Sequence, residues 1–267
     1  GEAAQQLAAA VLGSKTLEVF SKIPIKEIRK HKQTALDFSR QGLGPTEAIV
    51  LAALNQGSAV LNKLVLMGNA INDEGAIALG EALKINKSLK ELDLTNCKIG
   101  PDGGKALAVA LLAGTALLTK IMLSYNKIQD EGAAVLGEAL KSNKSLKELE
   151  LTRCSIGAEG GKALASAPLE GCAVLTKLVL PHNKIEDEGA IALGEALKVN
   201  KSLKELDLGH CEIGAVGGKA LAAALSEGSA VLTKLVLERN SIMDEGAAAL
   251  GEALKTNKSL TELGRGS

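Results

Sequence analysis

Leucine recurs along the chain in short triplets that alternate inward and outward positions. In Leu64-Val65-Leu66 the two leucines share one face of an extended segment, because successive side chains of a strand point to opposite faces. The first leucine of the triplet returns at steps of 28 and 29 residues. Its eight positions are Leu64, Leu92, Ile121, Leu149, Leu178, Leu206, Leu235 and Leu263. This spacing predicts a repeat protein built from equivalent units.

Each triplet is followed by a segment with helical periodicity. In the first such unit Leu79 and Leu83 fall on one helix face, four residues apart. Asp73 stands where an N-cap is expected, and Asn86, where the segment ends, suits a left-handed position. Because strand, helix and return fit within one short unit, consecutive strands are expected to be parallel neighbours with every helix on one side. Helices are wider than the roughly 4.8 Å between strands, so the stack should curve with the helices outside.

Two types of unit alternate along the array. One carries asparagine five residues after the first leucine of the triplet, and the other carries cysteine there. The asparagines are Asn69, Asn126, Asn183 and Asn240, and the cysteines are Cys97, Cys154 and Cys211. A side-chain amide at this position can bond the backbone of adjacent turns, and a buried thiol can replace it as a weak donor. Equivalent positions in separate units are too far apart to form disulfides, so these cysteines and Cys172 are predicted to be free thiols.

The pattern LxxLxLxxNxI alternating with LxxLxLxxCxI resembles the ribonuclease-inhibitor-type leucine-rich repeat. The same type of repeat is found in NLR immune receptors and in the Ran GTPase-activating protein. The resemblance implies an α/β leucine-rich-repeat solenoid, or horseshoe, with about nine parallel strands on the concave face and helices on the convex face. In that family the repeated asparagine and cysteine have a structural role.

The ends of the chain depart from the pattern. Residues 1–33 are predicted to form an N-terminal cap, with a first helix, a strand from Leu17 to Phe20 and a second helix opened by Pro24. The repeats are expected to occupy residues 34–263, and residues 264–267 are interpreted as a cloning remnant. Since no polar capping unit closes the array, its C-terminal end is predicted to fray or to self-associate.

Composition and charge narrow the function. Hydrophobic residues make up 46% of the chain and aromatic residues only 1%, so the core is expected to be aliphatic. The 31 Lys+Arg residues balance the 31 Asp+Glu residues, which argues against a nucleic-acid-binding surface. The sequence shows no signal-peptide pattern and no apolar run long enough for a membrane span. Together with the free thiols, these features predict a cytoplasmic protein that binds no membrane.

No catalytic centre, cofactor site or metal site is predicted. GPDGGKA and its two equivalents lack the first glycine and the final Ser or Thr of a phosphate-binding loop, so they are interpreted as repeat framework. His182 and His210 occupy matching positions in adjacent units and are expected within about 5 Å of each other. Tyr125, Arg153 and Arg239 occupy the same position in other units, which favours a varied surface over a metal site.

Residues between the leucines should point onto the concave face. A first row alternates lysine and glutamate, beginning with Lys63 and Glu91, and should neutralise itself through ion pairs. A second row is apolar in one unit type and acidic in the other, which favours partners with Lys or Arg. The repeats differ most at the next two positions, while their helices hardly vary. The predicted partner-binding residues, named here the concave strip, are Val65, Met67, Asp93, Met122, Tyr125, Glu150, Arg153, Val179, His182, Asp207, His210, Val236, Glu238 and Arg239.

The leading interpretation is a non-enzymatic protein-recognition module, because a long curved sheet offers an extended surface without an enclosed pocket. The sequence does not identify the partner. An engineered or consensus-derived scaffold without a native partner would also explain such uniform units. A GTPase-activating role of the Ran activator type is supported by the resemblance alone. Ribonuclease inhibition is less favoured, because the resembling inhibitor is acidic and rich in cysteine, whereas this chain is neutral and has four cysteines.

Overall fold

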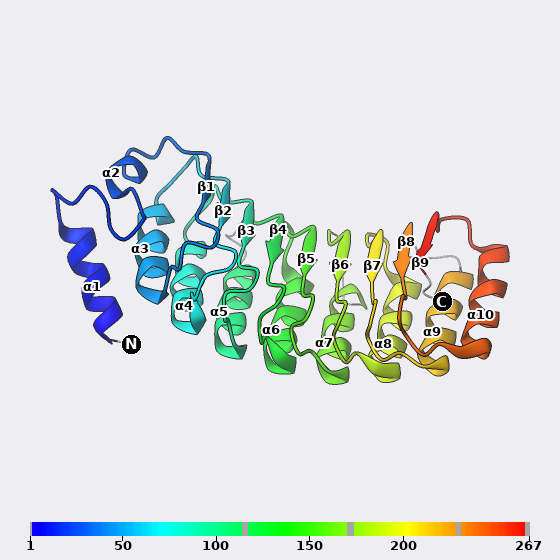
Figure 1. Cartoon of the computed structure of the whole chain (residues 1–267). Helices are drawn as coiled ribbons and strands as arrows, with labels where there is room; N and C mark the ends of the chain where they lie inside the picture. Colours follow the sequence, from blue (N-terminus) through cyan, green and yellow to red (C-terminus); the bar gives the residue numbers. More distant parts are fainter. Residues whose placement is uncertain (1, 114–116, 170–173, 228–230, 265–267) are drawn as a thin grey trace.

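The computed structural model describes residues 2–113, 117–169, 174–227 and 231–264. Within these residues, nine strands of three residues each form one parallel sheet, and their spatial order is their order in the chain. Figure 1 shows the units side by side in an elongated, gently curved array, with the helices from α3 to α10 on the same side of the sheet. The predicted fold class, an α/β solenoid with strands on one face and helices on the other, is confirmed.

Strands and helices alternate along the array. The strands are β1 Ala35–Asp37, β2 Lys63–Val65, β3 Glu91–Asp93, β4 Lys120–Met122, β5 Glu148–Glu150, β6 Lys177–Val179, β7 Glu205–Asp207, β8 Lys234–Val236 and β9 Glu262–Gly264. The helices are α1 Glu2–Gly13, α2 Ile25–Ile28, α3 Pro45–Gln56, α4 Asn72–Leu83, α5 Pro101–Leu112, α6 Gln129–Ser142, α7 Ala158–Leu169, α8 Glu186–Val199, α9 Ala215–Ser226 and α10 Met243–Thr256.

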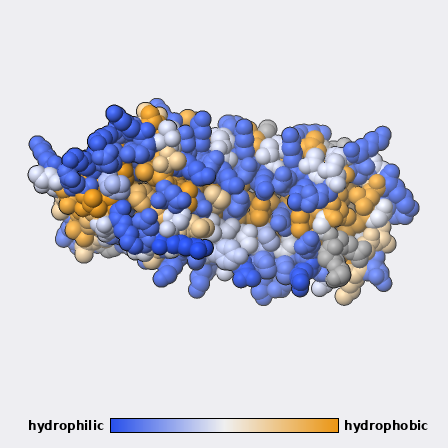
Figure 2. All heavy atoms as spheres, turned by 45° about the horizontal axis from the view of Figure 1, so that its top comes forward, coloured by the Kyte–Doolittle hydropathy of each residue, from blue (hydrophilic) through white to orange (hydrophobic). Residues whose placement is uncertain are grey.

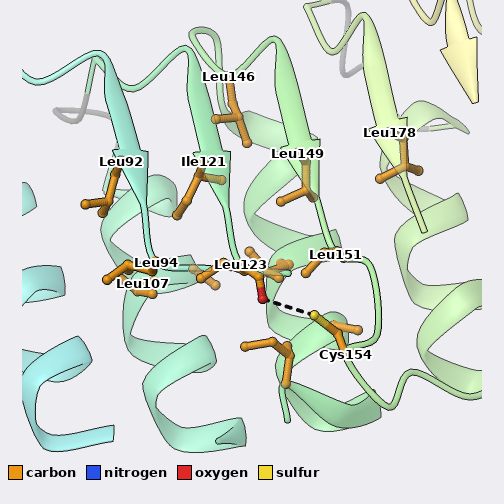
Figure 3. Packing of buried hydrophobic residues seen from close by; sticks show 14 of the residues in the cluster. Leu92, Leu94, Leu107, Ile121, Leu123, Leu146, Leu149, Leu151, Cys154 and Leu178 are labelled. Carbon is orange, nitrogen blue, oxygen red and sulfur yellow. Dashed lines mark hydrogen bonds between the residues drawn. The ribbon is translucent and has the colours of Figure 1, made fainter. Parts of the chain in front are cut away.

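The leucines of each unit form the core between sheet and helices. Leu149 and Leu151 are the two inward positions of one triplet, and both are fully buried. Figure 3 shows them beside Leu146 and near the equivalent positions of the preceding unit, Ile121 and Leu123. Burial of one such side chain contributes about 2 kcal/mol by removing it from water. The fold is therefore stabilised by the same aliphatic contact repeated along the array.

A ladder of side-chain hydrogen bonds holds the turn that follows each strand. Asn126 is buried, and its Oδ1 accepts hydrogen bonds from the backbone N of Cys97 at 3.0 Å and of Ile99 at 2.9 Å. Its Nδ2 donates to the carbonyl oxygens of Leu94 and Leu123, both at 2.8 Å. The equivalent four bonds recur at Asn69, Asn183 and Asn240. Each asparagine thus fastens its own unit to the unit before it.

The cysteines occupy the same position with fewer bonds. The Sγ of Cys154 donates to the carbonyl oxygen of Leu123 at 3.2 Å (Figure 3). Burial raises the pKa of the thiols of Cys97, Cys154 and Cys211 to about 12, so they stay protonated and are poor nucleophiles. All three are free, and the structural role predicted for this position is confirmed. Cys172 lies outside the described residues.

Asp73 is not the N-cap of its own helix, contrary to the sequence prediction. Helix α4 begins at Asn72, and its N-cap residue makes no side-chain bond. The Oδ1 of Asp73 instead accepts hydrogen bonds from the backbone N of Gly100 at 2.6 Å and of Gly103 at 2.9 Å, at the start of α5 in the next unit. Asp130 and Asp187 make the same pair of bonds to α7 and α9. The carboxylate therefore caps a helix across the unit boundary.

This cap explains the recurring GPDGGKA segment. A Cβ atom added at Gly103 would lie 2.6 Å from Oδ1 of Asp73, closer than non-bonded atoms approach. Glycine at this position therefore allows the carboxylate to reach the backbone of the neighbouring helix. The segment is repeat framework, as predicted, rather than a phosphate-binding loop.

We expect Asp130→Ala to lower the free energy of unfolding by about 1 to 2 kcal/mol, because two amides of α7 lose their acceptor. Asp244 provides the matched control. It holds the equivalent position in α10, is exposed, and makes no hydrogen bond or ion pair among the described residues. Asp244→Ala should change the free energy by less than about 0.5 kcal/mol. Urea unfolding followed by circular dichroism measures both, and equal losses would show that the bond across units is not the cause.

The helix-terminating asparagines do not adopt the predicted left-handed conformation. Asn143 is extended, with φ −66° and ψ 133°, and Asn200 and Asn257 are extended in the same way. Asn86 is also absent from the positive-φ residues of the described chain. The side chain explains the choice of residue, because Oδ1 of Asn143 accepts hydrogen bonds from the backbone N of Ser145 at 2.9 Å and of Leu146 at 2.8 Å. Asparagine is used here for its oxygen rather than for its tolerance of positive φ.

The segment before the first repeat is only partly as predicted. Helices α1 and α2 are present, but residues 17–20 do not form a strand. Phe20 instead makes an isolated antiparallel bridge with Ile23 across a tight turn.

The last unit leaves apolar side chains accessible. Leu254 of α10 is 42% exposed, and Leu263 of β9 is half-buried, whereas its equivalent Leu206 in β7 is buried. Self-association through this end therefore stays a prediction. We expect the apparent mass from light scattering to rise with protein concentration, and less so in Leu254→Lys. A monomer at every concentration would contradict it.

Candidate functional site

The register of the sheet aligns the concave strip across successive units. Asp93 pairs with Met122 in β3 and β4, and Glu150 pairs with Val179 in β5 and β6. None of the fourteen strip residues is buried. Nine are half-buried, and the five exposed ones are Tyr125, Arg153, His182, Glu238 and Arg239. The strip is thus a continuous accessible surface from β2 to β8, and its role in binding stays a prediction.

The first concave row consists of separate ion pairs. Each lysine pairs with the glutamate of the next unit, as in Lys63–Glu91 at 3.0 Å and Lys177–Glu205 at 3.1 Å. Among the described residues no ion pair joins a glutamate of this row to the lysine that follows it. The prediction that this row neutralises itself through ion pairs is confirmed, and the pairs are separate from one another. Exposed pairs contribute up to about 1 kcal/mol each, and they neutralise the row.

The second row keeps negative charge at the centre of the sheet. Glu150 is paired with Lys120 at 2.9 Å, but Asp207 forms no ion pair with any described residue. Its Oδ1 accepts a hydrogen bond from the backbone N of Gly209 at 3.0 Å. Asp207 lies between Val179 and Val236, over a hollow of about 230 Å³. The other charged side chains that line this hollow, Glu150, Glu205, Lys177 and Lys234, are all in ion pairs. The carboxylate of Asp207 beside the two valines therefore suits the stem and charge of a Lys or Arg side chain.

A second line of strip residues follows the edge where the strands turn into loops. Its members, named here the left-handed row, share positive φ values of 53° to 60°: Tyr125, Arg153, His182, His210 and Arg239. The backbone amides of the first four continue the sheet, since Tyr125 N donates to Thr152 O at 2.7 Å and His182 N donates to Gly209 O at 2.9 Å. These bonds hold successive members of the row at the spacing of adjacent strands, about 4.8 Å.

Planar side chains contact one another along this row. The Cζ of Arg153 lies 5.5 Å from the ring centroid of Tyr125, within range of a cation–π interaction. The rings of His182 and His210 stack with centroids 4.0 Å apart, which confirms their predicted proximity. Loss of hydration around the ring lowers the pKa of His182, and the nearby positive charges of His210 and Arg153 lower it further, against the opposing effect of Asp207. In the described residues no three His, Cys, Asp or Glu side chains are grouped to hold a metal ion.

Sequence reasoning did not single out Lys184 or Glu212, which lie beside the left-handed row. These two residues and Ser241 surround a hollow of about 380 Å³. The same hollow is lined by His182, His210 and Arg239. Lys184 and Glu212 pair with each other at 3.5 Å. Their position, two residues after the left-handed row, also varies between units, and that variation was the signal available in the sequence.

The face of the molecule seen in Figure 2 is mostly polar. Figure 2 shows hydrophobic residues as a broken band along the molecule, separated by hydrophilic residues. The helices of the described part of the chain are all too short or too polar to cross a lipid bilayer.

Comparison with known proteins identifies the repeats. A family model described as "Leucine Rich repeat" matches more than half of the chain in seven segments. They are residues 57–80, 86–108, 116–137, 142–165, 171–194, 199–222 and 228–251.

Similar proteins of known sequence share the repeats over most of this chain. NACHT, LRR and PYD domains-containing protein 5 of Bos taurus is 35% identical over 86% of this chain and 21% of its own length. The ribonuclease inhibitor of Sus scrofa is 31% identical over 80% of this chain and 53% of its own. The Ran GTPase-activating protein of Drosophila melanogaster is 33% identical over 79% of this chain and 33% of its own. The chain therefore spans between about a fifth and a half of each of these proteins.

Proposed function

This chain belongs to the leucine-rich repeat family, with repeats of the ribonuclease-inhibitor type, and we propose that it is a non-enzymatic module that binds a partner protein through its concave strip. Repeats of this family serve protein–protein interaction in general. The observation that carries the proposal is the placement of the strip. Its fourteen residues are all accessible and aligned, and they lie beside a row that neutralises its own charge.

The chemistry of the strip supports a protein ligand. Tyr125 is 51% exposed and lies against Arg153, and these two residue types anchor protein interfaces most often. Val179 and Val236 add apolar contacts around Asp207. The strip thus combines aromatic, apolar and charged groups of both signs, as interfaces between proteins do.

Selective capture from source lysate tests this proposal. The intact chain is compared with a strip variant in which Tyr125, Arg153, His182 and His210 are replaced by serine. A matched convex variant carries Lys141→Ser and Lys198→Ser, on helices α6 and α8. We expect one protein to be enriched by the intact chain and the convex variant but not by the strip variant. Circular dichroism first establishes that all three are folded.

Two outcomes would contradict the proposal. A chain that enriches nothing selectively would support a scaffold without a native partner. Acceleration of GTP hydrolysis on mixing with a Ran-type GTPase would contradict the non-enzymatic assignment and support the activator role. The same measurement with the strip variant would show whether that activity uses the concave face.

A further inference from the structure

The left-handed row holds its side chains in an unfavourable backbone conformation. Glycine and asparagine adopt positive φ at the lowest cost, and this chain uses them at Gly68 and Asn96, the equivalent positions of two earlier units. The next five units carry Tyr, Arg, His, His and Arg there instead. Bulky residues with positive φ tend to cluster at binding sites, where the surrounding structure supports the strain. Positive φ recurs at this turn in other units too, as at Arg40, so the conformation belongs to the repeat, and it is the succession of planar aromatic and cationic side chains in five adjacent units that points to a use.

The row carries positive charge that the protein does not neutralise. The guanidinium groups of Arg153 and Arg239 are exposed, and neither forms an ion pair with any described residue. Some lysines elsewhere are paired, as in Lys198 with Glu195 at 2.9 Å, whereas others such as Lys147 and Lys204 form no ion pair with a described residue either. The stacked and cation–π contacts hold the planar groups in place without providing counter-charge. An anionic ligand would meet donors already positioned to receive it.

The hollow beside the row provides a specific place for a carboxylate. His182, His210 and Arg239 line it, together with the hydroxyl-bearing Ser241. The charges of Lys184 and Glu212 cancel, because these two side chains pair with each other. The guanidinium is therefore the charged group of the hollow that lacks a partner among the described residues, and the imidazoles and the hydroxyl can donate hydrogen bonds.

We propose that the left-handed row binds an extended acidic segment of the partner protein, with one carboxylate in the hollow between His210 and Arg239. This inference rests on the proposed function and names the chemistry of the partner. Five units at about 4.8 Å cover roughly 19 Å, the length of about six extended residues. Asp207, which forms no ion pair with a described residue, lies on the neighbouring row and would repel a polyanion. A segment that mixes acidic with basic side chains fits both rows, and a nucleic acid does not.

Peptide titration of isotope-labelled protein by NMR tests the proposal. The probes are a peptide of about eight residues that alternates Glu with Ser, the same peptide with Gln for Glu, and a short oligothymidylate. Titration reaches about 10 mM, because a few exposed charge pairs give a Kd in the millimolar range. We expect the Glu peptide alone to shift the backbone amides of the left-handed row. No shift, an equal shift with the Gln peptide, or tighter binding of oligothymidylate would overturn the proposal.

Arginine variants at equivalent positions of different units test whether peptide binding depends on the positive charge of the left-handed row. The double variant Arg153→Gln with Arg239→Gln should raise the Kd of the Glu peptide by about tenfold or more. Arg40→Gln should leave that Kd unchanged. Arg40 is the matched control, because it is also exposed and has a φ of 55° at the same position of the first unit. Equal weakening by Arg40→Gln, or no weakening by the double variant, would overturn the assignment to this row.

The strain itself can be measured at Arg239, which makes no side-chain hydrogen bond, ion pair or ring contact with the described residues. Arg239→Asn should raise the urea midpoint of unfolding and should also weaken binding of the Glu peptide. A lower midpoint would refute the conformational argument. The proposed function can stand without this inference: strip-dependent capture of a partner, with no binding of the Glu peptide, would refute only the acidic segment.

Discussion

Asn126→Ala is expected to lower the free energy of unfolding by about 4 kcal/mol, as measured by urea denaturation. The substitution removes two acceptor and two donor bonds at a buried position. The backbone amides of Cys97 and Ile99 and the carbonyls of Leu94 and Leu123 then lose partners that water cannot easily replace. Each buried group left unpaired costs about 1 to 3 kcal/mol, less whatever local relaxation recovers.

Asn240→Ala separates the effect of burial from the effect of the bonds. Asn240 makes the equivalent four bonds in the last asparagine unit, at 2.7 to 3.1 Å, but it is only half-buried. Water can reach the backbone groups that lose their partner in this variant, so we expect the free energy of unfolding to fall by about 2 kcal/mol. Equal losses at the two sites would mean that burial does not set the energy. A loss below about 1 kcal/mol at Asn126 would show that the ladder is not a principal source of stability.

The repeat period and the inward leucines could be predicted because they depend on local periodicity. Alternation within the triplet places Leu64 and Leu66 on one face, and a four-residue spacing places Leu79 and Leu83 on another. Both are buried pairs in the structure. The parallel order of the strands follows from the shortness of the unit. Each of these inferences uses contacts within one unit or between adjacent units.

Contacts between specific groups of different units could not be read in the same way. The rule for helix capping is local, so it assigned Asp73 to its own helix. The actual donors, Gly100 and Gly103, lie 27 and 30 residues away and become neighbours only when the units stack. The positive φ of residues such as Tyr125 could not be predicted from the sequence for a related reason. Tyr125 has no preference for the left-handed region, and the sheet hydrogen bond from its amide to Thr152 places it there.

The residues of the candidate surface could be predicted by comparing the repeats with one another, because the varied positions differ between repeats whose helices are nearly identical. That comparison found the strip residues but not the hollow beside His210 and Arg239. A hollow depends on the three-dimensional spacing of side chains from three units. Comparison of the repeats therefore finds positions that vary, and the structure is needed to show which of them meet.

Binding of the partner recovered by capture should weaken by about 1 to 4 kcal/mol when Tyr125 and Arg153 are both replaced by alanine. Tyr125 offers the exposed aromatic ring of the strip, and Arg153 covers it at 5.5 Å. Removing both takes away a large contact area and a guanidinium without touching the leucine core. The free energy of unfolding should therefore change by less than about 0.5 kcal/mol. Isothermal titration calorimetry measures the affinity, and urea unfolding provides the stability.

The two single variants and the double variant form a thermodynamic cycle that tests whether the pair acts as one anchor. Since the guanidinium contacts the ring, losing either group alters the placement of the other, and the two losses should not add. Additive losses would mean that the partner contacts the two side chains independently. The matched control is Lys141→Ala with Lys198→Ala on the helices. If affinity falls in this control and is unaltered in the double variant, the interface lies on the convex face, and neither the concave strip nor the left-handed row binds the partner.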